Sequence, residues 1–288
     1  MKRKLCEFVT LALAVVFVLF SWLGCQPDTG ADQGSSETAD ETTPSSPANP
    51  PSPTDPDPVS PPEPEPEESP SSFTACTFPA AEFGTLRYWL YTPSNPTEQM
   101  PLIVYLHGGS GKGDNLNLIT DADGFPQYLQ TGRLGNVRAY VIIPQLPSSQ
   151  KGWANVAETA YDLIQYTLET YRLDSDNISL TGHSMGGTGT WNLACTYPEL
   201  FARIAPLSGS IRKTSAAIEQ LKNIPIRAFV GSADTTVPPE SSKEMIAALR
   251  AAGGDAEITV FEGADHFSVP GLTYLDQNIG LIDWLIGG

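Results

Sequence analysis

Residues 177–201 place a strand, a serine between glycines and a helix in direct succession. The run NISLT before residue 182 is β-rich, and the residues after Ser184 have helical spacing. Gly182 and Gly186 stand two positions before and two positions after the serine. A strand that turns sharply into a helix brings two stretches of backbone close together, and glycine removes the side chains that would clash. The chain therefore has to pack a helix against the end of a strand.

The rest of the chain repeats this alternation. β-rich runs lie at 85–93, 101–109, 138–145, 177–182, 202–210, 224–234 and 256–266, and helical patterns lie at 158–173, 190–201, 241–254 and 275–285. Such alternation predicts an α/β fold with a mostly parallel central sheet and helices on both faces. Ligand sites in these sheets lie beyond the carboxyl ends of the strands.

The chain is predicted to have three parts, at 1–24, 25–72 and 73–288. Residues 1–24 start with basic residues and continue into an apolar run, which is the pattern of an export signal. The run is close in length to a membrane-spanning helix, so an uncleaved anchor is the alternative. Residues 22–25 read WLGC and resemble the lipobox of bacterial lipoproteins, apart from Trp22, where that pattern usually has Leu. The resemblance implies that Cys25 is lipidated and that the protein is exported and tethered to a membrane.

Residues 26–72 are dominated by proline and acidic side chains. They hold 13 of the 26 prolines and 11 acidic residues, with neither Lys nor Arg. Such a segment cannot bury enough apolar surface to offset the entropy of ordering it. We expect a disordered, semi-stiff spacer, and the alternative is an acidic binding segment.

The acidity of the remaining chain excludes one class of partner. Of the total charge of −17, the linker carries −11 and the signal +2, which leaves −8 for residues 73–288. This balance argues against a nucleic acid as the partner.

The cysteines give no metal site. Cys6 leaves with a cleaved signal, so Cys76 and Cys195 are the cysteines of the exported domain. They either pair in an oxidising compartment or remain free thiols. No Cys/His spacing typical of a bound metal is present.

Ser184, at the apex of the turn, is the candidate nucleophile. A serine hydroxyl needs a base, normally histidine, and the base needs an orienting carboxylate. Of the three histidines, His107 follows the strand at 101–106, and His183 is adjacent to the serine, so its ring is expected to point away from the hydroxyl. His266, in a loop after the last strand, is left as the candidate base.

Asp234 is the candidate carboxylate. It lies at the end of the β-rich run at 224–234 and between Ser184 and His266 in the chain, which is the order of a nucleophile-elbow enzyme. Asp265 is adjacent to His266 and therefore poorly placed to reach its ring. The alternative for Asp234 is a turn-forming aspartate.

Backbone N–H groups near the serine are expected to stabilise a developing oxyanion. The Met185 N–H lies at the start of a helix, and the glycines after the strand at 101–106 offer a second donor, from Gly109 with Gly108 beside it. A phosphate-binding loop at 108–115 is excluded, because no Gly-Lys-Ser/Thr leads into a helix there.

These motifs together resemble the α/β-hydrolase family over residues 80–288. HGG at 107–109, GHSMGG at 182–187 and GADH at 263–266 carry the resemblance, and it is closest to small carboxylesterases and predicted peptidases related to feruloyl and polyhydroxyalkanoate esterases. By analogy with this family, Trp153 and Gln145 line the substrate pocket, and the alternative for each is a role in the core or on the surface. No long lid insertion is evident in the sequence, which departs from the family pattern. The segment after His266 lacks the tryptophan often found there, which leaves the pocket less well defined.

The predicted function is a carboxylesterase-type serine hydrolase. Ser184, His266 and Asp234 would cleave small or polymer-borne esters through an acyl-enzyme, at the cell surface or in the periplasm. The predicted chemistry needs neither a metal nor an organic cofactor. The alternatives are a serine peptidase on the same fold and a catalytically silent, tethered binding module.

Overall fold

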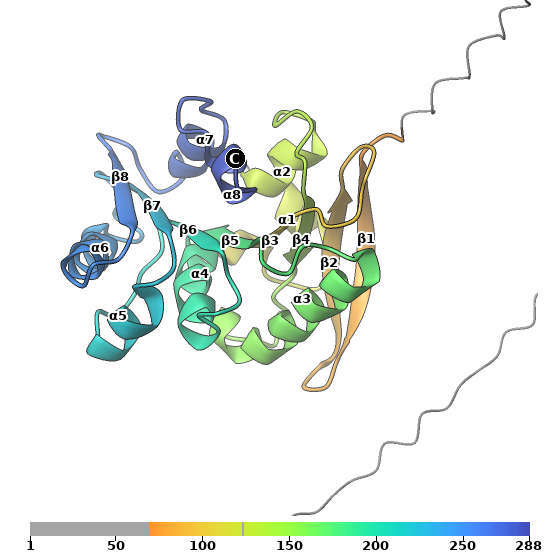
Figure 1. The fold of residues 1–288 in the computed structure, drawn as a ribbon, viewed down its shortest axis with the longest axis horizontal. Coiled ribbons are helices and arrows are strands. Elements are labelled where there is room, and N and C mark those ends of the chain that lie inside the picture. Colours follow the sequence, from red (N-terminus) through yellow and green to blue (C-terminus); the bar gives the residue numbers. More distant parts are fainter. Residues whose placement is uncertain (1–68, 123) are drawn as a thin grey trace, which may run out of the picture. The chain divides into compact units, whose positions relative to one another are not determined.

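The computed structural model describes residues 69–122 and 124–288, which form one eight-stranded sheet flanked by helices (Figure 1). The strands are β1 Ser72–Ala80, β2 Gly84–Thr92, β3 Leu102–Leu106, β4 Tyr140–Pro144, β5 Ile178–His183, β6 Arg203–Leu207, β7 Ile226–Gly231 and β8 Ala256–Phe261. Their order is β1-β2-β4-β3-β5-β6-β7-β8. The pairs β1–β2 and β2–β4 are antiparallel, and every later pair is parallel.

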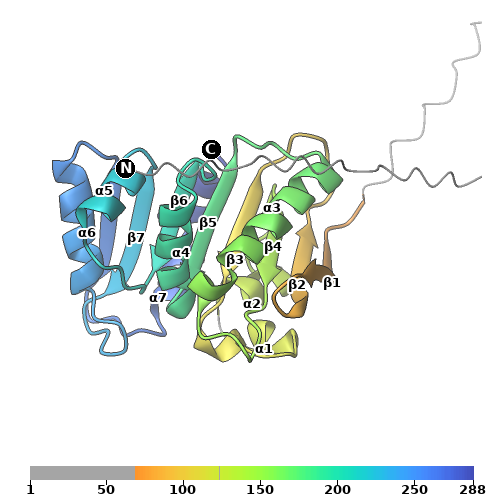
Figure 2. The same cartoon turned by 90° about the horizontal axis from the view of Figure 1, so that it is seen from below.

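Helices cover both faces of this sheet. Figure 2 shows one face covered by α3 Ala157–Tyr171, α4 Met185–Thr196, α5 Ser215–Leu221 and α6 Glu240–Ala251. The other face carries α1 Asn117–Thr120, α2 Phe125–Gln130, α7 Val269–Tyr274 and α8 Leu281–Leu285, and short 3-10 helices span Gly109–Gly111 and Trp153–Val156. The predicted α/β-hydrolase architecture, with a mostly parallel sheet and helices on both faces, is confirmed.

The central strand β3 divides its side chains between two apolar cores. All five residues of β3 are buried. Leu102, Val104 and Leu106 face the core under α3 and α4, whereas Ile103 and Tyr105 face the core under α2 and α7. This strict alternation follows from the two-residue period of a strand. It places Tyr105 on the same side of the sheet as the short helices α1 and α2.

The predicted helix at 275–285 is wrong in its first half. Asp276 accepts a hydrogen bond from the Asn278 N–H at 2.9 Å, which is a local turn. Gly280 then has a left-handed backbone, and a helix begins only at Leu281. The apolar residues of this segment are spaced as in a continuous helix, because the turn is made by the polar residues that lie between them.

Several short elements were not predicted at all. They are β1, α1, α2, α5 and α7. Helix α5 is capped by Thr214, whose hydroxyl accepts a hydrogen bond from the Ala217 N–H, and this signal was present in the sequence. Helix α4 begins at Met185, directly after the serine as expected, and it ends at Thr196, before the end of the helical pattern at 190–201.

Some sequence predictions concern residues 1–68, which lie outside the described part of the chain. These are the signal, the lipidation of Cys25 and the disordered linker as far as residue 68. The linker was predicted to reach residue 72, but β1 begins at Ser72. Among residues 69–122 and 124–288, no helix is long and apolar enough to cross a bilayer, and no group of three or more His, Cys, Asp or Glu residues is arranged to hold a metal ion. Cys76 and Cys195 are both free thiols, and burial raises the pKa of Cys195 to about 11.

Candidate active site

Ser184 sits on a strained turn between β5 and α4. Its φ of 60° and ψ of −120° are rarely adopted by residues other than glycine. A Cβ on Gly182 would lie 2.5 Å from the Leu106 carbonyl oxygen, and a Cβ on Gly186 would overlap the same carbonyl. The glycines are therefore required by the close approach of α4 to β3, as the sequence indicated.

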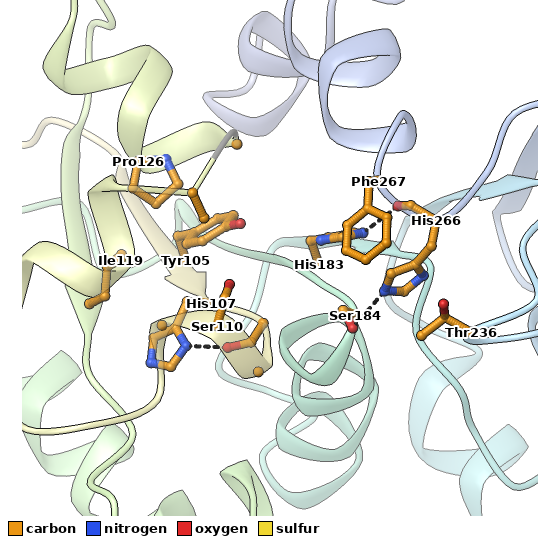
Figure 3. Close-up of a pocket in the computed structure, with 15 residues that line it drawn as sticks. Tyr105, His107, Ser110, Ile119, Pro126, His183, Ser184, Thr236, His266 and Phe267 are labelled. Carbon is orange, nitrogen blue, oxygen red and sulfur yellow. Dashed lines mark hydrogen bonds between the residues drawn. The ribbon is translucent and has the colours of Figure 1, made fainter.

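The three side chains predicted to form a catalytic triad lie within hydrogen-bonding distance of one another. The Ser184 hydroxyl lies 2.8 Å from Nε2 of His266, and Nδ1 of His266 lies 2.7 Å from Oδ2 of Asp234 (Figure 3 shows the first of these). Asp234 follows β7 and His266 follows β8, so the carboxyl ends of β5, β7 and β8 supply all three. With a proton on Nδ1 for the carboxylate, Nε2 is left to accept the serine proton.

Asp234 is held as an ionised, fixed acceptor. Its Oδ1 accepts hydrogen bonds from the N–H groups of Thr236 and Val237, at 2.9 and 2.8 Å, and the side chain is buried. Burial opposes ionisation, but hydrogen bonds from the Val237 N–H and from His266 outweigh it and hold the pKa of Asp234 below its usual value. Asp265, in contrast, is bonded to Ser268 and takes no part in the triad geometry.

His183 lies beside the triad, where no role was predicted for it. Its Nε2 lies 2.9 Å from the His266 carbonyl oxygen, and the two rings are 4.7 Å apart. Burial, with a smaller contribution from His266, lowers the pKa of His183 to about 4, so the ring is neutral and Nε2–H donates to the carbonyl. This bond fixes the backbone of the loop that carries His266. The only signal in the sequence was the adjacency of His183 to the serine.

A glycine loop approaches the other side of the serine. A Cβ on Gly108 would lie 3.4 Å from the Ser184 Cβ and 4.0 Å from its hydroxyl oxygen. Gly109 opens a 3-10 helix and Met185 opens α4. N–H groups in a first helical turn lack partners within the helix, so both are available to an oxyanion beside Ser184.

Of the two roles expected for Trp153 and Gln145, the structure shows the core role, because both are buried behind this loop and neither lines the cavity beside Ser184. Trp153 Nε1–H donates to the His107 carbonyl oxygen at 3.0 Å. The Gln145 amide donates to the carbonyl oxygens of Gly111 and Asn115, at 2.9 and 2.6 Å. The N–H donors of both side chains therefore satisfy buried loop carbonyls, and neither side chain is among the residues that line the cavity beside Ser184.

His107 also supports the loop. Its Nε2 accepts a hydrogen bond from the Leu146 N–H at 2.9 Å, and Nδ1–H donates to the Gly108 carbonyl oxygen at 2.6 Å. Burial lowers the pKa of His107 to about 4, so it keeps this neutral form. The neutral ring therefore ties the glycine loop to the residues after β4.

A cavity of about 470 Å³ opens beside Ser184. Its walls come from the end of β3, the 108–111 loop, the α1–α2 region and the loops that carry Thr236 and His266. The lining residues are Tyr105, His107, Gly108, Gly109, Ser110, Gly111, Ile119, Ala122, Gly124, Pro126, His183, Ser184, Thr236, His266 and Phe267. In Figure 3, Tyr105, Ile119 and Pro126 lie on one side, and His266 and Thr236 lie on the other.

Comparison with known proteins gives matches over parts of the chain. Residues 144–271 match the family model described as "Dienelactone hydrolase family". A putative carboxymethylenebutenolidase of Salmonella typhimurium is 35% identical over 100 residues, which cover 32% of this chain and 37% of that protein. A probable acetylxylan esterase A of Aspergillus fumigatus is 28% identical over 138 residues, which cover 44% of this chain and 35% of that protein. These matches span little more than a third of each relative.

Among solved structures, the crystal structure of a thermostable esterase is similar over a larger part. It is 30% identical, with a TM-score of 0.62, over 74% of this chain and 62% of that chain. The family match covers β5, the serine turn, Asp234 and His266. The chain therefore has the α/β-hydrolase fold, and its residues 144–271 are similar to the dienelactone hydrolase family.

Proposed function

We propose that this protein is a carboxylesterase-type serine hydrolase that acts through an acyl-enzyme. The observation that carries the proposal is the hydrogen-bonded series from the Ser184 hydroxyl through His266 to the buried Asp234, at the edge of an open cavity. Such a series is the arrangement that makes a serine hydroxyl nucleophilic. The names of the similar proteins, which include esterases and a lactone-opening enzyme class, support ester cleavage.

In the first half-reaction, the Ser184 oxygen attacks the ester carbonyl carbon while its proton passes to Nε2 of His266. Asp234 stabilises the imidazolium that forms. The N–H groups of Met185 and Gly109, with Gly108 beside them, hold the negative carbonyl oxygen. Collapse of the intermediate breaks the bond to the alcohol oxygen, which takes the proton from His266, and the acyl group stays on Ser184.

In the second half-reaction, water replaces the alcohol. His266 takes a proton from the water as its oxygen attacks the acyl carbon, and the same N–H groups hold the oxyanion. Collapse breaks the bond to the serine oxygen, which recovers the proton from His266, and the carboxylic acid leaves. None of these steps uses a metal or an organic cofactor.

The cavity is compatible with either a small ester or an ester carried on a polymer. Phe267 lines the cavity and is 74% exposed, so the mouth beside His266 opens to solvent. An alcohol that leaves next to His266 would point through this mouth, and a bulky alcohol therefore has room. The name of the acetylxylan esterase relative supports a carbohydrate-borne ester as one such substrate.

An ester and amide panel tests the proposal. The wild-type protein should hydrolyse p-nitrophenyl acetate and butyrate faster than aminoacyl p-nitroanilides. Ser184→Ala should lose roughly four or more orders of magnitude in rate with an unchanged circular dichroism spectrum. Ser210→Ala, a control beyond the adjacent strand β6, should keep full activity. Undiminished turnover by Ser184→Ala would refute the proposal, and faster amide cleavage would favour a peptidase.

We also propose that the protein is exported and held to a membrane by a lipid on Cys25, with residues 26–72 as a spacer. The basic and apolar residues 1–24 and the WLGC sequence support this. The full chain expressed in a bacterial host should incorporate labelled palmitate and partition into the detergent phase. The Cys25→Ser variant should do neither. Equal labelling of both would contradict the proposal.

A further inference from the structure

The far wall of the cavity contains a phenol hydroxyl that the proposed reaction does not use. Tyr105 is 4% exposed and lines the cavity, and its ring packs against Phe125 with centroids 5.2 Å apart. Figure 3 shows its hydroxyl pointing into the cavity, on the side of His183 and Phe267. Among the described residues, the Tyr105 hydroxyl has no hydrogen-bond partner.

The neighbouring Tyr274, in contrast, has a hydrogen-bond partner within the protein. The two rings meet edge to face, 6.3 Å apart, and both side chains are buried. The Tyr274 hydroxyl lies 2.6 Å from the Thr181 hydroxyl and is satisfied within the protein. A buried hydroxyl usually finds such a partner, so the free hydroxyl of Tyr105 is left for whatever fills the cavity.

The surroundings of Tyr105 define what it can bind. The apolar side chains of Ile119 and Pro126 lie on the same side of the cavity. Among the described residues that line the cavity, none is Asp, Glu, Lys or Arg. Burial raises the pKa of Tyr105 well above its usual value, so the phenol stays protonated and donates. An apolar group with one acceptor oxygen complements this wall.

This wall holds the acyl part of the ester rather than the alcohol. The alcohol oxygen must lie next to His266, which returns the proton to it. In Figure 3, Tyr105 lies across the cavity from His266, with Ser184 nearer to His266. The group on the other side of the carbonyl carbon therefore extends toward Tyr105.

We propose that Tyr105 is a specificity-determining residue, whose hydroxyl selects acyl groups that are apolar but carry a hydroxyl or ether oxygen at their far end. This inference rests on the proposed ester hydrolysis and adds the class of acyl group. An acyl group without that oxygen would displace water from the Tyr105 hydroxyl and give no partner in return. Leaving a buried donor unpaired costs about 1–3 kcal/mol, so the discrimination should be roughly tenfold or more.

Gly124 provides the space beside this hydroxyl. A Cβ on Gly124 would meet only the Tyr105 hydroxyl oxygen, at 3.8 Å. The Gly124 backbone is extended, so alanine is accommodated there without strain. Gly124→Ala therefore narrows the cavity at the oxygen of Tyr105 and leaves Ser184 and His266 untouched.

The test compares matched methyl esters with and without a para-hydroxyl group on the ring, in the benzoate, phenylacetate and 3-phenylpropanoate series. Across this series the ring stays rigid, and each added CH₂ group increases the distance between the ester carbonyl at Ser184 and the para-hydroxyl group. In the wild type, kcat/KM should favour the hydroxylated ester by roughly tenfold at the chain length that reaches Tyr105. Tyr105→Phe should abolish that preference and should raise kcat/KM for the unsubstituted ester.

Two further variants control the interpretation. Tyr91→Phe removes a buried phenol oxygen from the same core, away from the cavity, and should keep the preference. Gly124→Ala should reduce turnover of the hydroxylated ester more than that of its partner. No preference at any chain length, or a preference that survives Tyr105→Phe, would overturn the inference while ester hydrolysis itself stands. Absence of hydrolysis of every ester would refute the proposed function instead.

Discussion

Two glycine-rich regions meet at Ser184, and their glycines have different structural roles. Gly182, Gly186 and Gly187, in the turn between β5 and α4, each touch the backbone of a neighbouring strand or loop so closely that a Cβ would overlap it. Gly109 and Gly124, on the cavity side, have open space around them, apart from the Tyr105 hydroxyl beside Gly124.

This difference separates the turn, which positions the catalytic serine, from the cavity wall, which contacts the substrate. The turn cannot accept an added side-chain atom, because it holds the serine in a strained conformation packed against two strands. The cavity wall has empty volume, because a substrate occupies it. The two regions should therefore respond in opposite ways to the same chemical change.

The largest contrast is expected from adding one methyl group to each region. Gly186→Ala forces a Cβ into the Leu106 carbonyl, so we expect loss of soluble, folded protein or destabilisation of more than about 3 kcal/mol. Gly109→Ala meets no atom within 4 Å and should keep the wild-type urea midpoint, with changed kcat/KM only. Equal stability of the two variants would contradict the proposed difference between the turn glycines and the cavity glycines.

Replacement of Asp234 tests the rigid region without disturbing its shape. Asp234→Asn keeps the size of the side chain but loses the charge that orients His266, so activity should fall by roughly 10³–10⁴-fold. Asp265→Asn, next to His266 but bonded to Ser268 rather than to the His266 ring, should stay within about threefold of the wild type. Ester kinetics on both variants, with thermal melts as the folding control, measure this. A small effect at Asp234 would mean that the histidine is oriented by something else.

Lowering the pH should reduce the free energy of unfolding, because each region contains one buried neutral histidine. The pKa values of His107 and His183 are held at about 4, against 6.5 when unfolded, so between these pH values the unfolded chain binds the extra protons. The free energy of unfolding should therefore fall as pH drops from about 6.5 to about 4, by on the order of 3 kcal/mol for each histidine. Asp234, whose folded pKa is lowered, adds a loss at still lower pH.

Urea unfolding at pH 7, 6, 5 and 4 measures this slope. The His183→Gln variant should show about half of the loss between pH 6.5 and 4, because one of the two neutral histidines is gone. An unfolding free energy that stays level across this range would show that the histidines are not held neutral.

The smallest effect is expected from the bond between His183 and the loop of His266. His183→Phe keeps a ring beside His266 but removes the Nε2–H donor to its carbonyl, and a lost hydrogen bond of this kind costs about 1 kcal/mol. We expect a loss in kcat of roughly fivefold with little change in KM. Because His183→Gln can still donate a hydrogen bond, it should recover part of the loss. If both variants match the wild type, the bond has no positioning role.

Sequence reasoning found the parts of the site that depend on local patterns and missed those that depend on packing. The positions of Ser184, Asp234 and His266 were readable because each follows a strand in a fixed chain order. For Trp153 and Gln145 the sequence left a pocket role, taken by analogy, and a core role open, because their partners are loop carbonyls distant in the chain. Tyr105 reads as an ordinary residue of a buried strand. Its role appears only when α1 and α2 are seen to leave its hydroxyl uncovered.

For the fold as well, the sequence predicts the elements that have a clear local pattern and misses the short elements that depend on packing. The central strands β3 and β4 are continuous apolar runs, so the sequence predicts them, and the long helices α3 and α6 have clear apolar faces. The short helices α1 and α7 hold too few residues to show a helical period. They are fixed by their burial against Tyr105 and its neighbours, which no local pattern records.

Labelling with a fluorophosphonate probe tests the central claim most directly, since only an activated serine reacts with it. We predict one adduct per chain, mapped by peptide mass spectrometry to Ser184, with labelling abolished in Ser184→Ala and strongly slowed in Asp234→Asn. An unlabelled, folded wild-type protein, or an adduct on another serine, would contradict the account.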